Sequence, residues 1–176
     1  MDRTDIGEER PAPDDLWTCG GSDDLWTRGG SWVLAQFPLT ALALVAARVG
    51  PTLPQAVAGP ARWLGAGLFV TGGLLFLGGA LEMGPKLTPF PKPNEDTDLF
   101  QTGAFGLARH PIYGGGVIAV FGWALLNGAW LGLLAAAGLA LFFDAKARLE
   151  ERWLAAKFPQ YGAYRKRVRK LIPFIY

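Results

Sequence analysis

Residues 111–143 read PIYGGGVIAVFGWALLNGAWLGLLAAAGLALFF, a run of 33 residues without one charged side chain. As a single helix this run would extend about 50 Å, well beyond a bilayer hydrocarbon core of about 30 Å. Asn127-Gly128, a turn dipeptide, lies near its middle. We therefore predict a hairpin of two short membrane helices, over 112–127 and 129–143. One long, strongly tilted helix is the alternative.

Two further uncharged runs precede the hairpin, residues 29–47 and 63–81, each 19 residues long. Each has about the length that one helical span requires. The first run follows an acidic stretch and lacks the basic start and small-residue cleavage site of a signal peptide. The prediction is an all-α integral membrane protein with four transmembrane helices, the last two forming a short hairpin.

The composition excludes several classes of protein. Only 18% of the 176 residues are charged, which argues against a small soluble enzyme with an evenly charged surface. With Cys19 as the one cysteine and His110 as the one histidine, neither a disulfide scaffold nor a four-ligand zinc site can be built. We expect no metal site, and the net charge of +2 gives no indication of a nucleic-acid partner.

The two ends of the chain differ in charge. Residues 1–30 carry eight acids and three arginines, whereas residues 144–176 carry nine bases and three acids. By the positive-inside rule, the basic C-terminal helical segment and the loop 82–110 are expected in the cytoplasm, and so is the N-terminus. Arg48 and Arg62 count weakly against this orientation. The Ala- and Gly-rich composition favours a bacterial inner membrane.

The N-terminal part contains a duplication. DDLWTCGGS at 14–22 is followed by DDLWTRGGS at 23–31. Two copies are too few for a solenoid. We predict a disordered acidic tail over 1–30, followed by one membrane domain over 31–176.

A first group of chemically capable residues begins the hairpin. Arg109 offers a planar fork for a carboxylate, and His110 can donate, accept or titrate near neutrality. Pro111 suits the first position of a helix, and Tyr113 lies one turn further on the face of His110. Taken alone, the group is also typical of a positive anchor before a helix.

A second group follows the hairpin, on a helix predicted to continue from the last span. Glu150 and Glu151 are adjacent, so their side chains point about 100° apart and cannot both face one small ligand. The spacing of Lys146 and Glu150, and of Arg148 and Glu151, also predicts a solvated, salt-bridged helix. The basic run 165–170 suits contact with anionic lipid headgroups.

The two groups and their spacing resemble the isoprenylcysteine carboxyl methyltransferase family, which is grouped with membrane phospholipid methyltransferases. The resemblance covers about residues 80–176 and rests on the ordered set Gly103, Phe105, Arg109, His110, Pro111, Tyr113, Gly115, Glu150, Glu151, Leu154, Phe158, Tyr161, Tyr164, Val168 and Pro173. Members often have Gly-Pro-Tyr where this chain has Gly103-Ala104-Phe105, and the eukaryotic enzymes have more spans.

The resemblance implies methyl transfer from S-adenosylmethionine, with a cofactor site built from residues 100–176. It makes Arg109, His110 and Glu150 the catalytic candidates. Its cofactor-binding candidates are Arg109, His110, Pro111, Tyr113, Gly115, Glu150, Glu151, Tyr161 and Tyr164. Carboxylates suit the ribose hydroxyls, a cation or imidazole suits the amino-acid carboxylate, and aromatic faces suit the sulfonium.

The acceptor stays open at this point. The resemblance implies an acceptor that partitions into the membrane: an isoprenylcysteine-like carboxylate, a phospholipid amine or another lipid. Two other functions remain as alternatives. One is an NADPH-dependent membrane reductase of the sterol type, with phosphate-binding arginines from the run 165–170. The other is a non-catalytic accessory protein that keeps the fold.

Overall fold

A computed structural model describes residues 29–93 and 98–176, and these residues are helical with short connections. Cys19 and nearly all of the duplication lie outside the described residues. The elements, in order, are α1 (Gly30–Val49), α2 (Gln55–Met83), the 3₁₀ turn η2 (Gly84–Lys86), α3 (Gly103–Leu107), α4 (Pro111–Asn127), α5 (Trp130–Lys157) and α6 (Tyr161–Arg167). The described parts contain no strand, so the all-α prediction is confirmed for them.

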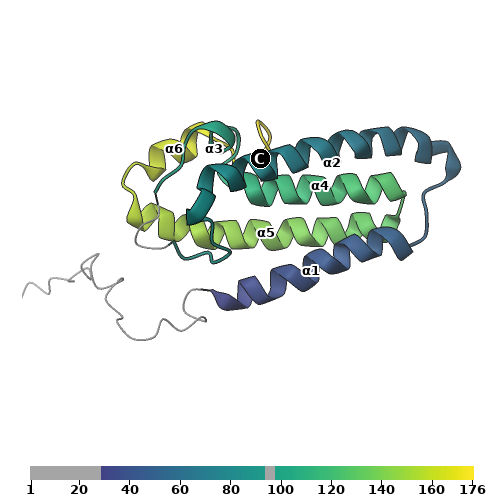
Figure 1. Ribbon diagram of the computed structural model, residues 1–176, viewed down its shortest axis with the longest axis horizontal. Helices are drawn as coiled ribbons and strands as arrows, with labels where there is room; N and C mark the ends of the chain where they lie inside the picture. Colours follow the sequence, from purple (N-terminus) through teal and green to yellow (C-terminus); the bar gives the residue numbers. More distant parts are fainter. Residues whose placement is uncertain (1–28, 94–97) are drawn as a thin grey trace, which may run out of the picture.

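Four long helices run alongside one another and form the body of the molecule (Figure 1). By length and composition, α1, α2 with η2, and α5 each suffice to cross a bilayer. The fourth, α4, is apolar but has 17 residues, a length of about 26 Å. The predicted runs thus all form apolar helices, three of full spanning length and one shorter.

The long uncharged run is broken at the predicted dipeptide. Helix α4 ends at Asn127, whose side chain donates to the Trp123 carbonyl oxygen at 2.8 Å. Gly128 follows with φ 64° and ψ 29°, a left-handed conformation that favours glycine. The alternative of one long tilted helix is therefore wrong. Helix α5 continues without interruption to Lys157, beyond the end of the uncharged run at Phe143, as predicted.

Close approach of α2 and α4 fixes the centre of the bundle. A Cβ on Gly115 would lie 2.4 Å from the Phe76 backbone nitrogen, and one on Gly72 would lie 2.5 Å from that of Ala119. Only glycine fits there, which is the small-residue packing expected of membrane helices. Gly67 and Gly73 differ, because a Cβ there would meet no neighbour within 4 Å.

The connections collect at two ends of the bundle. At one end the Trp130 amide donates to the Pro51 carbonyl at 3.1 Å, which joins the α1–α2 and α4–α5 turns. At the other end the Arg109 and His110 amides donate to the carbonyls of Arg169 and Lys170 at 2.8 and 2.9 Å. The loop before α4 and the C-terminal segment therefore share an end, where α3 and α6 also lie (Figure 1).

Candidate active site

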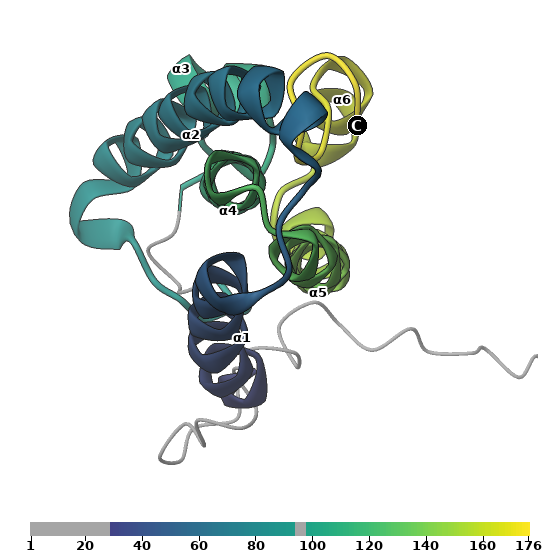
Figure 2. The same cartoon turned by 90° about the vertical axis from the view of Figure 1, so that its right-hand side faces the viewer.

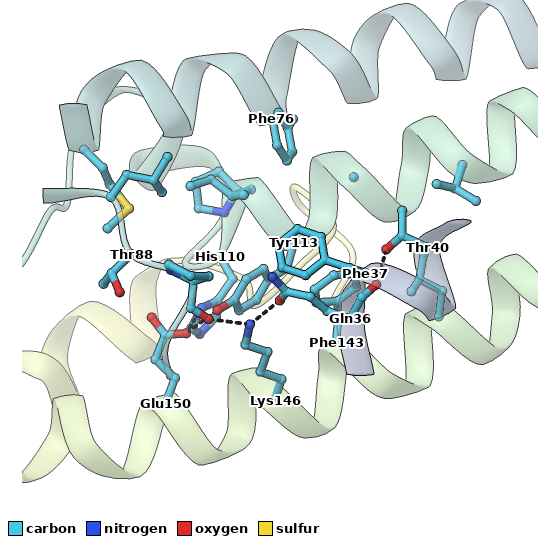
Figure 3. A pocket seen from close by; sticks show the side chains of 18 of the residues that line it. Gln36, Phe37, Thr40, Phe76, Thr88, His110, Tyr113, Phe143, Lys146 and Glu150 are labelled. Atoms are coloured by element: carbon cyan, nitrogen blue, oxygen red, sulfur yellow. Dashed lines mark hydrogen bonds and ion pairs between the residues drawn. The ribbon is translucent and has the colours of Figure 1, made fainter. Parts of the chain in front are cut away.

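A cavity of about 550 Å³ lies among α1, α2, α4 and α5, near the end that carries α3 and α6 (Figure 3). Its wall is apolar over most of its extent, with side chains such as Phe37, Phe76, Val120, Leu139 and Phe143. Its polar lining residues are Gln36, Thr40, Thr88, His110, Tyr113, Lys146 and Glu150. The cavity thus combines a large apolar part with one polar end.

The polar end is organised around Tyr113. Its hydroxyl donates to Glu150 Oε2 at 2.9 Å, which joins α4 to α5. The rings of His110 and Tyr113 are stacked, with centroids 5.5 Å apart and planes 2° from parallel. The predicted shared face of these two residues is therefore present, because they are three positions apart across the start of α4. Phe143 lies 5.0 Å from the Tyr113 ring and begins the apolar wall.

His110 lies between the two glutamates. Its Nδ1 is 3.8 Å from Glu150 Oε2 and its Nε2 is 3.5 Å from Glu151 Oε1. The side chain is 4% exposed, and Nε2 makes no hydrogen bond within the described residues. A buried ring nitrogen without a hydrogen bond is a position at which a polar ligand atom could bind.

Arg109 points away from the cavity. Its Nε donates to Glu151 Oε1 at 2.9 Å and its Nη2 lies 2.8 Å from the same oxygen. Its Nη1 donates to the carbonyls of Arg165 and Val168. Both members of the Arg109–Glu151 pair are buried, at 7% and 5% side-chain exposure. The pair thus ties α5 to α6 and to the C-terminal segment, directly behind His110.

The adjacent glutamates diverge, as their positions on one helix predict. Glu150 lines the cavity, whereas Glu151 faces Arg109. Neither expected ion pair, Lys146 with Glu150 or Arg148 with Glu151, forms a direct salt bridge, although the Glu150 charge acts on Lys146 at longer range. Arg148 pairs with Asp144, one turn back, at 2.6 Å. Lys146 is buried and donates instead to the Gln36 side chain and the Pro89 carbonyl, because α1 and the loop after η2 close over it.

The two tyrosines of α6 are buried outside the cavity lining. The Tyr164 hydroxyl donates to the Phe105 carbonyl oxygen at 2.6 Å. The Tyr161 ring packs edge-on against the Tyr164 ring, with centroids 5.9 Å apart. Burial raises the pKa of both hydroxyls above the usual range, so both stay protonated at neutral pH. These tyrosines fix α6 against the neighbouring Leu99, Leu154 and Phe158.

The remaining predicted positions divide between cavity and packing. Pro111 begins α4 and lines the cavity. Gly115 packs against α2, and a Cβ on Gly114 would lie 1.8 Å from the Leu171 carbonyl oxygen. Of the three consecutive glycines, Gly116 lines the cavity.

Sequence reasoning missed Lys146 and Gln36 as site residues. Gln36 and Thr40 are polar residues one turn apart within an otherwise apolar run, and both line the cavity. Lys146 follows Phe143 by three positions and precedes Glu150 by four, which places all three on one side of α5. That spacing was a signal for Lys146, but the partner on α1 is a long-range contact.

The model of the phospholipid methyltransferase family matches residues 60–161, more than half of the chain. The chain belongs to the phospholipid methyltransferase family. The match runs from early α2 to the first residue of α6 and contains His110, Tyr113, Glu150 and Glu151. Family membership, together with the apolar helices, supports an integral membrane protein.

Two curated proteins are similar to part of this chain. One is the cobalt-zinc-cadmium resistance protein CzcN of Cupriavidus metallidurans, 29% identical over 80 residues, which are 45% of this chain and 37% of that protein. The other is the nickel-cobalt-cadmium resistance protein NccN of Alcaligenes xylosoxydans xylosoxydans, also 29% identical over 80 residues, which are 45% of this chain and 38% of that protein. The match thus spans well under half the length of either relative. No solved structure matches the chain.

Proposed function

We propose that this protein transfers the methyl group of S-adenosylmethionine to an acceptor that partitions into the membrane. The observation that carries the proposal is one cavity in which His110, Tyr113 and Glu150 form a polar end and aromatic and aliphatic side chains form most of the remaining wall. Family membership supports the reaction, and the two-part cavity supports a polar cofactor beside an apolar acceptor.

The residues of the polar end fit S-adenosylmethionine chemically. The Glu150 carboxylate suits the ribose hydroxyls as an acceptor, and the Tyr113 face suits a sulfonium cation. The cofactor, when bound, supplies a methyl group already activated for displacement. The chain then has to align donor and acceptor and to exclude water, for which a mostly apolar cavity is suited.

The proposed roles follow from these positions. His110 and Glu150 are the groups that can take a proton if the acceptor is an amine, whereas a carboxylate acceptor needs no base. Arg109 and Glu151 enter the proposal as the buried pair that positions His110 and the C-terminal segment. Tyr161 and Tyr164 hold α6 at the same end.

We propose that the acceptor enters sideways from the bilayer. Phe37 of α1 and Phe76 of α2 line the cavity and are 63% and 40% exposed. Figure 2 shows α1 and α2 on opposite sides of α4. In this proposal an alkyl chain passes between α1 and α2 to reach the cavity.

The contacts of the basic run 165–170 do not support the reductase alternative. Lys170 donates to Asp144 at 2.7 Å and Arg167 to Gln101 at 3.2 Å. Neither side chain lines the cavity, so neither stands where a dinucleotide phosphate would have to be held.

Calorimetric titration of S-adenosylhomocysteine into the detergent-purified protein tests the proposal. We expect saturable binding in the wild type and a loss of about tenfold or more in Glu150→Gln, because a hydrogen bond to a charged group contributes about 1.5–3 kcal/mol. Arg152→Gln, an exposed neighbour on the same helix, is the control and should bind like the wild type. A folded wild-type protein that does not bind would overturn the cofactor assignment.

A further inference from the structure

Lys146 is a buried cation in the wall of the cavity. The whole residue has 0% exposure, yet it lines the cavity between Phe143 and Glu150 (Figure 3). Its ammonium group donates to Gln36 Oε1 and, at 2.8 Å, to the Pro89 carbonyl oxygen. It also lies 5.1 Å from the centroid of the Tyr113 ring. The group therefore faces the site from α5.

Among the described residues, the ammonium group of Lys146 forms no direct ion pair, although the nearby Glu150 carboxylate acts on its charge at longer range. Both of its hydrogen-bond acceptors are neutral oxygens, and within residues 29–93 and 98–176 it forms no salt bridge. The nearby Glu150 carboxylate accepts from Tyr113 and lies 3.8 Å from His110. Burying an ammonium whose hydrogen bonds go only to neutral oxygens is costly, so an anion bound in direct contact would stabilise it.

The position of Lys146 defines which kind of anion fits. Leu139, Phe143, Lys146 and Glu150 follow one another at spacings of four, three and four residues, and all line the cavity. This side of α5 therefore changes from apolar to cationic to anionic along about three helical turns. A ligand whose negative group lies at Lys146 would have its remainder among Leu139, Phe143 and the facing Phe37.

We propose that Lys146 binds the anionic headgroup of the methyl acceptor, so that the acceptor is an alkyl amphiphile carrying a carboxylate or a phosphate. A lysine ammonium is a compact point charge that serves either group. The proposal rests on the proposed function only in naming the bound amphiphile as the acceptor. The cofactor then lies one turn further along α5, towards Glu150.

A purely structural role for Lys146 predicts something different. Its two hydrogen bonds join α5 to α1 and to the loop after η2, so it could simply brace the wall. Lys146→Gln removes the charge while keeping a hydrogen-bond donor, and Lys146→Arg keeps the charge. Gln36→Leu removes one brace while leaving the charge in place. The three variants separate charge from bracing.

The experiment measures binding of dodecanoate, dodecyl phosphate and dodecanol, by displacement of a fluorescent fatty acid from the full-length protein in a non-ionic detergent at pH 7. We expect the wild type to prefer at least one anion over the alcohol by about tenfold or more. Lys146→Gln should abolish the preference, whereas Lys146→Arg and Gln36→Leu should keep it. Comparison of the two anions then distinguishes a carboxylate from a phosphate source.

Two results would overturn the proposal. One is a preference for anions that survives in folded Lys146→Gln, and the other is an equal loss in Gln36→Leu, which would leave only the bracing role. S-adenosylhomocysteine binding by the wild type is measured in the same preparations. Cofactor binding without anion preference refutes the inference on Lys146 alone, whereas anion preference without cofactor binding supports the anion site and refutes methyl transfer.

Discussion

At the scale of single residues, the hydroxyl of Tyr113 orients the Glu150 carboxylate, which we propose binds the cofactor. Tyr113→Phe keeps the aromatic face but removes the 2.9 Å hydrogen bond to Glu150. We expect the dissociation constant for S-adenosylhomocysteine to rise about three- to tenfold. A hydrogen bond to a charged group contributes about 1.5–3 kcal/mol, and this one acts on the cofactor only through the orientation of Glu150. Calorimetric titration measures it. Tyr176→Phe is the control, because that hydroxyl bonds Asp144 outside the cavity and its removal should leave cofactor binding unchanged. An equal effect of both variants would contradict the role given to Tyr113.

Arg109 is expected to act on stability more than on binding. Arg109→Met removes the closest partner of the buried Glu151 and frees the carbonyls of Arg165 and Val168. Breaking a buried ion pair in this way costs about 3–5 kcal/mol. The measurement is thermal unfolding in detergent, where a strongly lowered midpoint is expected.

Two further variants check that interpretation of Arg109. The double variant Arg109→Met with Glu151→Leu removes the stranded charge and should recover part of the lost stability. Arg148→Gln breaks an exposed pair with Asp144 and should change the midpoint little. A midpoint of the double variant no higher than that of Arg109→Met would show that the pair itself is not what holds the segment.

The residues of the candidate site were easier to predict from the sequence than the directions of their side chains. The shared face of His110 and Tyr113 and the divergence of Glu150 from Glu151 follow from helical geometry alone, and both are present. That Arg109 turns towards the carbonyls of residues 165–168 depends on contacts more than 50 residues apart in the chain. No local pattern carries such information, so this side chain was expected at the cofactor.

At the scale of elements, the α2–α4 contact determines whether the cavity has a fixed shape. Gly115, a cofactor-binding candidate by resemblance, packs against α2 in the structure. Gly115→Ala would place a methyl group 2.4 Å from the backbone nitrogen of Phe76, so the two helices must separate. We expect a loss of about 1–3 kcal/mol in stability, as for other overpacked contacts.

A matched glycine on α2 provides the control for that contact. A Cβ at Gly73 would meet no neighbour within 4 Å, and alanine is the better helix former. Gly73→Ala should therefore keep or raise the thermal midpoint that Gly115→Ala lowers. If both substitutions lowered the midpoint equally, the cause would be helix-wide and not the close approach of α2 and α4.

Elements whose signal is local could be predicted well. Asn127-Gly128 gave the position of the turn, because the left-handed conformation at Gly128 is a requirement of a single residue. The apolar helices could be predicted from the uncharged runs, because a lack of charged residues is also a local property of the sequence. The contribution of α1 to the site could not be predicted, since Gln36 reaches Lys146 across 110 positions of the chain. The resemblance begins near residue 80 and does not include α1.

At the scale of the whole molecule, the basic segment and the polar end of the cavity lie at the same end of the bundle. The amides of Arg109 and His110 bond the carbonyls of Arg169 and Lys170, which fixes that arrangement. An excess of lysine and arginine near the ends of spans favours the cytoplasmic side. We therefore expect the site to open towards the cytoplasm.

Labelling with a membrane-impermeant maleimide tests this orientation, in a background where Cys19→Ser removes the native thiol. Lys166→Cys places a cysteine at an exposed position of α6. Thr52→Cys places one at an exposed position in the turn at the opposite end of the bundle. In intact bacterial cells of an expression host we expect Thr52→Cys to react and Lys166→Cys to react only after the membrane is opened. The reverse pattern would place the cavity's polar end outside, away from a cytoplasmic cofactor. It would refute the proposed orientation. The packing of the helices would be unaffected, because the contacts at each end of the bundle do not depend on the side of the membrane on which that end lies.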